Sequence, residues 1–182
     1  MKVILSENDI VSTQLSWLCV KPILEEVRGK EAAVKKDAYN RLNDAQKALY
    51  LFYAFHNHTN TTAEFYWFAS YFVSELKGWR ELTKGLLFYG EEQLVLICNE
   101  MEQVVTAHNK QAVGTWRQAL ASDLDHDTEL LGQVARLYEQ YRPSAEKSIQ
   151  RMNEYVKSHS EQFYHLEAQE RGDESEDDPI SK

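Results

Sequence analysis

The sequence predicts an all-α protein, a single-domain bundle of about seven to eight helices. Apolar residues make up 43% of the 182 residues, and in most stretches they recur at the spacing of a helix with one apolar face. Only 7 glycines and 3 prolines interrupt these stretches, whereas a β fold needs many turns. A chain of this length forms one domain and buries a sizeable core without a disulfide or a structural metal.

The N-terminal segment predicts two short helices. The first begins after Ser6 or Asn8, because the apolar residues that follow recur at helical spacing. Pro22 ends or kinks it, since proline lacks the backbone N–H that a helix interior uses. A second segment then runs from Pro22 to Val27 and stops at Gly29.

The middle of the chain predicts three helices that carry most of the aromatic residues. Residues 31–42 have a helical apolar pattern, and Asn43 with Gln46 forms a capping box in front of the next helix. The polar stretch 56–62 favours a loop, because Asn and Thr side chains compete for backbone hydrogen bonds. A threonine at its end then caps a helix over 63–76.

The C-terminal half predicts the remaining helices. Gly78 and Gly90 bound a segment over 79–89, and a well-formed amphipathic helix follows over 91–109. A shorter helical segment, 115–121, leads through an acidic connection to a helix over 128–141. We expect Pro143 to break the chain there, with a last helix from Ser144 to Phe163.

Acidic residues concentrate at the C-terminus. The formal net charge is −9, and residues 166–182 hold seven acidic and two basic residues with almost no apolar ones. Such a segment cannot bury enough surface to order itself. We therefore expect a helical domain over 1–165 and a disordered, flexible acidic tail over 166–182, which acts as a solubility extension or as an arm for a basic partner.

Cysteine usage and hydropathy predict a cytoplasmic protein. Cys19 and Cys98 lie far apart in apolar runs and read as buried free thiols. The N-terminus lacks the apolar stretch of a signal peptide, and no window approaches the length of a membrane span.

Nucleic acid is disfavoured as a direct partner. Phosphate binding needs clustered basic residues. The longest basic cluster, Lys35 and Lys36, is expected to be paired with Glu31 and Asp37. A basic protein is the better electrostatic match.

No metal or cofactor site is predicted. His56 and His58 are two residues apart, so on a helix they point away from each other, and no further ligand is near. Asp123, Asp125 and Asp127 resemble the start of a calcium loop, but the sixth position, Thr128, and the twelfth, Val134, do not fit one.

No catalytic motif is predicted either. The sequence has no nucleophile elbow and no phosphate-binding glycine loop, so we expect no enzymatic activity. One alternative remains, in which the fold assembles a site from the scattered residues His56, Glu64, Tyr66 and His108.

The aromatic concentration has two interpretations. Ten of the aromatic residues lie between Tyr50 and Phe72, more than one apolar stripe on a helix can hide. They form either a packed core or a pocket for a small molecule or peptide. The pocket candidates are Tyr53, His56, Phe65, Tyr66, Trp67 and Tyr71.

The middle of the chain resembles a bacterial family of small acidic helical proteins known for a DNA-mimic member that binds a transcriptional repressor. The family's Leu…Gln-x-Ala-Leu-Tyr helix is matched by Leu42, Gln46, Ala48, Leu49 and Tyr50. Its aromatic junction is matched by Phe65 and Phe68, although Thr62 to Glu64 replace its glycine pair and Ser70 its asparagine, and Gly90 matches its later helix end. The resemblance implies an all-helical fold, no enzymatic activity, self-association into a homodimer and binding to a basic protein surface.

Together these observations predict a non-enzymatic acidic protein that binds a basic, nucleic-acid-binding partner, as a DNA mimic or regulator. Carboxylates on helix faces would make the contact. The expected partner-binding residues are Glu91, Glu92, Asp123, Asp125, Asp127 and Glu129. The alternative is a helical protein that binds a small molecule or peptide with its aromatic cluster.

Overall fold

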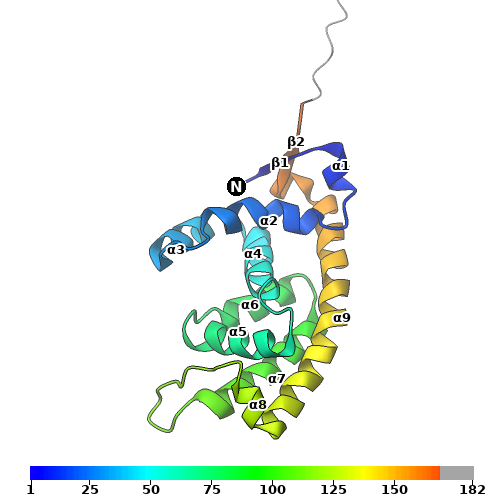
Figure 1. Cartoon of the computed structure of the whole chain (residues 1–182). Coiled ribbons are helices and arrows are strands. Elements are labelled where there is room, and N and C mark those ends of the chain that lie inside the picture. Colours follow the sequence, from blue (N-terminus) through cyan, green and yellow to red (C-terminus); the bar gives the residue numbers. More distant parts are fainter. Residues whose placement is uncertain (169–182) are drawn as a thin grey trace, which may run out of the picture.

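The computed structural model describes residues 1–168 and confirms the all-α fold class, with 70% of the described residues in helices. The long helix α9 runs along one side of the molecule, where α2, α5, α7 and α8 pack against it, and α3 lies on the opposite side (Figure 1). The helices of the described part are α1 (Glu7–Ile10), α2 (Leu15–Glu26), α3 (Ala32–Asn40), α4 (Asp44–His56), α5 (Thr62–Ser74), α6 (Trp79–Phe88), α7 (Glu92–Asn109), α8 (Asp123–His126) and α9 (Thr128–Ser158), with a short 3₁₀ turn, η1, over Ser160–Gln162.

Side-chain caps fix several helix starts where the sequence predicts them. The Asn43 side chain accepts the Gln46 N–H, and the Gln46 side chain accepts the Asn43 N–H, which completes the capping box of α4. Thr61 caps α5 through the Glu64 N–H. Asp127 caps α9 by accepting the backbone N–H groups of Glu129 and Leu130.

The predicted break at Pro143 is wrong, and Pro22 does not end its helix, because both prolines lie inside continuous helices, α2 and α9. Each proline is exposed, so its ring lies on the solvent side of its helix. On either side of Pro143, the buried Tyr141 and Ala145 hold the helix against the core. Tertiary packing thus overrides the local signal.

The helical segment predicted over 115–121 is also absent. This stretch is irregular, and a single bridge pairs Lys110 with Trp116. Its backbone hydrogen bonds go instead to the end of α7, where the Arg117 N–H donates to the Asn109 carbonyl over 2.8 Å.

Two short strands join the ends of the described chain. β1 (Val3–Leu5) pairs in parallel with β2 (Tyr164–Leu166), with Val3 opposite Tyr164 (Figure 1). Neither strand is predicted from the sequence. β2 includes Leu166, which the sequence predicts as part of the tail. Residues 169–182 of the predicted tail lie outside the described residues.

Helix α4 lies at the centre of the bundle and packs against α2 and α6. Its buried Phe55 packs against the aromatic rings of Phe65 in α5 and Tyr141 in α9. Most of the aromatic concentration is therefore core.

We expect Gly85→Ala to destabilise the protein although alanine favours helices. A Cβ at Gly85 in α6 would lie 3.0 Å from the Ala48 Cα in α4, so a backbone must move. We expect a loss of about 1–3 kcal/mol in the free energy of unfolding, measured by urea denaturation.

Gly132 is the matched control, because a Cβ there on the exposed side of α9 meets nothing within 4 Å. Gly132→Ala should stabilise the protein by up to about 1 kcal/mol through helix propensity alone. If both substitutions stabilise the protein, the close approach of α4 and α6 is not tight.

Candidate binding groove

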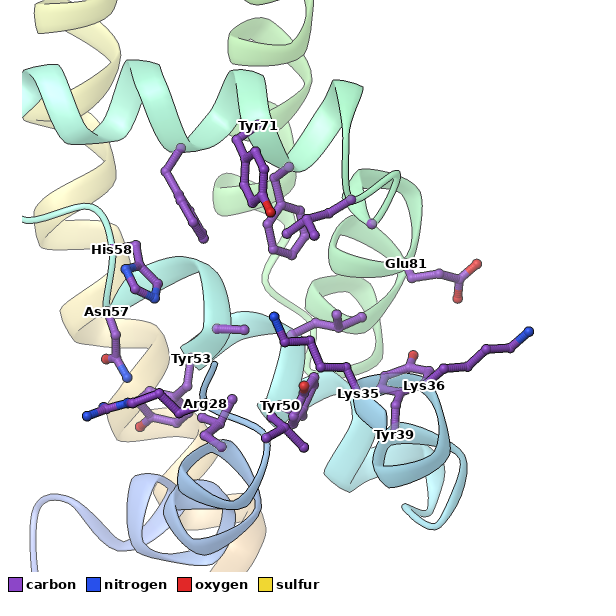
Figure 2. A pocket seen from close by; sticks show the side chains of 18 of the residues that line it. Arg28, Lys35, Lys36, Tyr39, Tyr50, Tyr53, Asn57, His58, Tyr71 and Glu81 are labelled. Atoms are coloured by element: carbon purple, nitrogen blue, oxygen red, sulfur yellow. The ribbon is translucent and has the colours of Figure 1, made fainter. Parts of the chain in front are cut away.

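A groove of about 740 Å³ opens between α2, α3, α4 and the C-terminal end of α5. Side chains from all four elements converge on it (Figure 2). This volume lies in the range of small-molecule and peptide pockets, roughly 300–1,000 Å³. We refer to it as the α2–α5 groove.

The floor of the α2–α5 groove is aromatic. Tyr50 and Tyr53 of α4 are buried, and their rings pack on neighbours from other helices, Tyr39 at 5.7 Å and Trp17 at 5.3 Å between centroids. Phe68 from α5 adds a further buried ring. A partner would meet a rigid apolar surface here.

Gly78 lets the chain after α5 pass close to the Phe72 ring, which lines the groove. A Cβ at Gly78 would lie only 2.8 Å from the Phe72 ring. The Gly78 N–H donates to the Phe72 carbonyl over 3.1 Å and ends the helix. This close approach places Lys77, just before it, at the edge of the groove.

The rim of the α2–α5 groove is basic. It carries four cations, Arg28, Lys35, Lys36 and Lys77, against two carboxylates, Glu25 and Glu81. Both carboxylates already have partners on their own helices. Glu25 lies 4.0 Å from the Lys21 amine, and Glu81 lies 3.8 Å from the Lys84 amine.

The four rim cations, in contrast, form no ion pair with any carboxylate in residues 1–168. The expectation that Glu31 and Asp37 neutralise Lys35 and Lys36 is therefore wrong for the described structure. Figure 2 shows the reason for Lys35, whose side chain reaches from α3 into the groove toward Tyr71. An acidic protein thus presents a locally positive groove.

The groove includes only part of the predicted pocket. Of the six candidates, Tyr53 and Tyr71 line it. Phe65 and Tyr66 are fully buried, and His56 turns toward Tyr141, with 3.0 Å between Nδ1 and the hydroxyl oxygen.

Trp67, the remaining candidate, lies outside the groove but next to it. Its exposed ring stacks on Tyr71 at 5.8 Å between centroids, with an angle of 1° between the ring planes. The α2 and α3 residues that line the groove, which include Trp17 and Lys35, were not predicted from the sequence. The only local signal was the pair of adjacent lysines.

Two of the six predicted partner-binding carboxylates are used inside the protein. Glu91 is 1% exposed and is bound by Arg151 and by the Ser148 hydroxyl. Its assignment as an exposed contact residue is wrong, because this ion pair to α9 buries it. Glu92, Asp125 and Glu129 are exposed.

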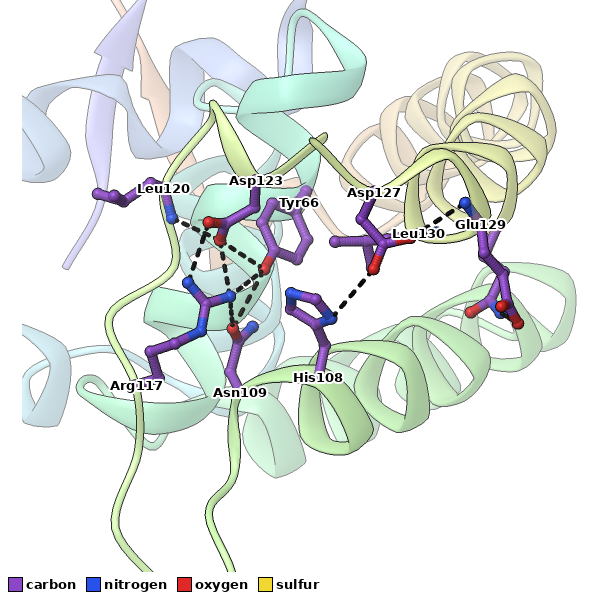
Figure 3. Close-up of polar contacts among 10 residues, drawn as sticks. Tyr66, His108, Asn109, Arg117, Leu120, Asp123, Asp127, Glu129 and Leu130 are labelled. Carbon is purple, nitrogen blue, oxygen red and sulfur yellow. Dashed lines mark hydrogen bonds and ion pairs between the residues drawn. The ribbon is translucent and has the colours of Figure 1, made fainter. Parts of the chain in front are cut away.

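Asp123 is the second internal carboxylate. Arg117 donates to both of its oxygens at 3.0 and 2.8 Å, and the Tyr66 hydroxyl donates to it at 3.0 Å (Figure 3). These contacts lower the pKa of Asp123 to about 2, mainly through the Arg117 hydrogen bonds. Asn109 joins the same cluster, so this network ties the irregular segment to α5 and α7.

Asp127 caps α9 and lies 3.9 Å from the His108 ring nitrogen (Figure 3). His108 is also near Tyr66, with 6.2 Å between ring centroids. His56 contacts Tyr141 instead, and the Glu64 carboxylate accepts the Asn60 N–H. Of these four residues of the alternative catalytic site, Tyr66 and His108 therefore lie together, whereas His56 and Glu64 have other partners.

Residues 1–168 contain neither a candidate metal site nor a helix that could cross a membrane. No group of three or more His, Cys, Asp or Glu side chains in this range is placed to hold a metal ion. No helix in it combines the length and apolarity needed to cross a membrane.

His56 makes stability depend on pH. Burial lowers its pKa from 6.5 to about 4, and Arg142 contributes further. The unfolded state therefore binds more protons between these values, so stability is full above about pH 6.5 and falls as the pH drops toward 4. We expect a loss on the order of 2 kcal/mol in the free energy of unfolding over this window.

The measurement is urea denaturation at several pH values. His56→Gln should flatten the dependence between pH 6.5 and 4, whereas the same change at the exposed His126 should leave it intact. A slope that persists in His56→Gln would assign the effect to another group.

No family model, no curated protein and no solved structure matches this chain.

Proposed function

We propose that the protein is a non-enzymatic binding module whose α2–α5 groove takes a short acidic peptide segment with apolar side chains from a partner protein. One observation carries this proposal. Four rim cations without a carboxylate partner in residues 1–168 surround an aromatic floor in a groove of about 740 Å³. Carboxylates of a bound segment would pair with the rim, and its apolar side chains would cover the floor.

A peptide fits the groove better than a compact small molecule. The cations come from three separate elements, the end of α2, α3 and the end of α5, so they are spread along the rim. An extended chain can present carboxylates at several points and place apolar residues between them. The aromatic rings of the floor suit contacts with the apolar side chains of such a segment.

The test is fluorescence anisotropy of a labelled short peptide that alternates Glu with Leu and Phe, titrated with the full chain. Lys35→Glu should weaken binding by about tenfold or more, and added salt should weaken binding to the native protein. Lys147→Glu is the matched control, because this exposed residue of α9 makes the same charge change away from the groove. We expect at most about a twofold effect there.

Equal weakening by the two variants would refute the groove as the site, and so would an absence of binding at low salt. Tighter binding of a single-stranded oligonucleotide than of the peptide would replace the acidic peptide with nucleic acid as the ligand.

A second candidate is the binding of a basic protein by exposed carboxylates, with Glu92, Asp125 and Glu129 supporting it. Changing these three residues to amides should then reduce recovery of the same basic proteins from lysate at low salt. Unchanged recovery would remove these residues from the interface. The DNA-mimic role and self-association remain proposals of the same kind.

A further inference from the structure

We propose that the C-terminal residues 169–182 of the same chain occupy the α2–α5 groove and compete with partner segments. This inference rests on the proposed function, since it names an occupant of the same groove. The observations that lead to it are the charge of the rim, the composition of these residues and the length of chain that they provide.

Charge complementarity is the first argument. Residues 169–182 contain six carboxylates and two basic residues, and the rim carries four cations whose described surroundings leave them without an ion pair. The two rim carboxylates are engaged by Lys21 and Lys84. The tail carboxylates are Glu170, Asp173, Glu174, Glu176, Asp177 and Asp178.

Composition is the second argument. The acidic run is followed directly by Pro179 and Ile180. This order places one short apolar element beside several carboxylates, which is the combination that an aromatic floor with a basic rim would bind.

Reach is the third argument. Fourteen extended residues span up to about 46 Å. The groove is close to the end of the described chain, because the Gln162 carbonyl accepts hydrogen bonds from the Asn43 and Gln46 side chains at the start of α4. Tyr53 of the same helix lines the groove, and α4 rises only roughly 10 Å from Gln46 to Tyr53. These residues follow β2, which ends at Leu166 on the surface of the domain. The tail is therefore long enough to reach the groove from there.

Because the tail belongs to the same chain as the groove, a weak contact is enough to occupy the groove. A segment joined by a short flexible connection faces its site at an effective concentration on the order of millimolar. Even a millimolar intrinsic affinity then keeps the groove occupied about half of the time. A partner segment has to bind more tightly than this to displace the tail.

The first experiment tests the tail directly and needs no partner. A carbodiimide joins a carboxylate to a nearby lysine amine as an amide with loss of water, and mass spectrometry locates the product. We expect the tail carboxylates of the full chain to couple to Lys35, Lys36 or Lys77 in preference to Lys147. Coupling without preference for the rim lysines would overturn the inference.

Mixing isotope-labelled with unlabelled protein separates two arrangements. Products within one chain support the proposal. Products mainly between a labelled and an unlabelled chain would overturn the intramolecular arrangement and assign the groove to the tail of a second copy.

The second experiment measures competition in the peptide titration. A full-length variant with the six tail carboxylates changed to amides should bind the acidic peptide roughly twofold more tightly than the native chain at low salt, because the groove is then free all of the time and not half of it. In the Lys35→Glu background this ratio should fall to near one, because the tail and the peptide share that cation.

The two proposals fail in different ways. If the peptide binds neither protein but rim coupling occurs, the tail occupies the groove and the proposed function is wrong. If the peptide binds the native chain and the amide variant equally, with no rim preference in the coupling, the proposed function stands and the tail inference is overturned.

Discussion

Replacing Arg151 with methionine is expected to lower the free energy of unfolding by about 3 kcal/mol, because it leaves the Glu91 carboxylate buried without its counter-ion. Arg151 Nε donates to Glu91 over 2.7 Å, and its terminal nitrogen and the Ser148 hydroxyl bind the same carboxylate. Glu91 is 1% exposed, whereas the Arg151 side chain is 56% exposed. The loss of stability therefore comes from the Glu91 carboxylate, which water cannot reach.

Arg136→Met provides the control for this prediction. Arg136 binds Glu100 over 2.8 Å, but both side chains are about half exposed, and such surface pairs contribute only about 0–1 kcal/mol. Urea denaturation of both variants at neutral pH makes the comparison. Similar losses would mean that Glu91 gains enough solvent or other donors to stay charged without Arg151.

Features that depend on neighbours in the sequence could be predicted. The capping box of Asn43 and Gln46 involves residues three positions apart, and it forms as expected. The same holds for the helical periodicity that gives the fold class. These signals are local, so the sequence alone contains them.

Features that depend on distant partners could not be predicted. Glu91 stands before α7, where an exposed acidic residue would suit the helix dipole, yet Arg151 lies 60 positions away in the sequence. The three-residue strands β1 and β2 pair the two ends of the described chain, and neither has an alternating pattern long enough to detect.

The residues of the candidate groove divide in the same way, into those that the sequence predicts and those that it does not. Tyr53 and Tyr71 belong to the aromatic stretch that the sequence marks as core or pocket. The α3 side of the groove could not be predicted, because Lys35 and Lys36 have acidic neighbours in the sequence that predict neutralised charge. In the fold Lys35 reaches toward the α5 side of the groove instead (Figure 2).

Net charge does not describe the charge within the groove, for a related reason. A value of −9 describes the whole chain, whereas binding depends on the potential within a single groove. The carboxylates that dominate the sum lie partly in residues 169–182 and partly in internal ion pairs. The groove can therefore attract acidic segments although the protein is acidic.

Phe55→Ala is expected to cost about 3–5 kcal/mol of stability, which is the usual loss for a fully buried aromatic ring. Phe55 is 1% exposed and lies at the centre of the aromatic core. Its ring contacts Phe65, Phe68, Phe72, Trp79 and Tyr141. Two of these neighbours, Phe68 and Phe72, also line the groove, so the cavity left by the substitution lies directly beneath the binding surface.

This connection predicts a joint effect on folding and binding. Phe55→Leu, which leaves a smaller cavity, should keep the protein folded. It should still weaken binding of the acidic peptide in the anisotropy assay, because Phe68 and Phe72 lose a packed ring behind them. Phe88→Ala removes a ring that is 46% exposed and remote from the groove, and it should change neither property strongly. A Phe55→Leu protein with lower stability and unchanged peptide affinity would show that the groove floor does not depend on the core beneath it.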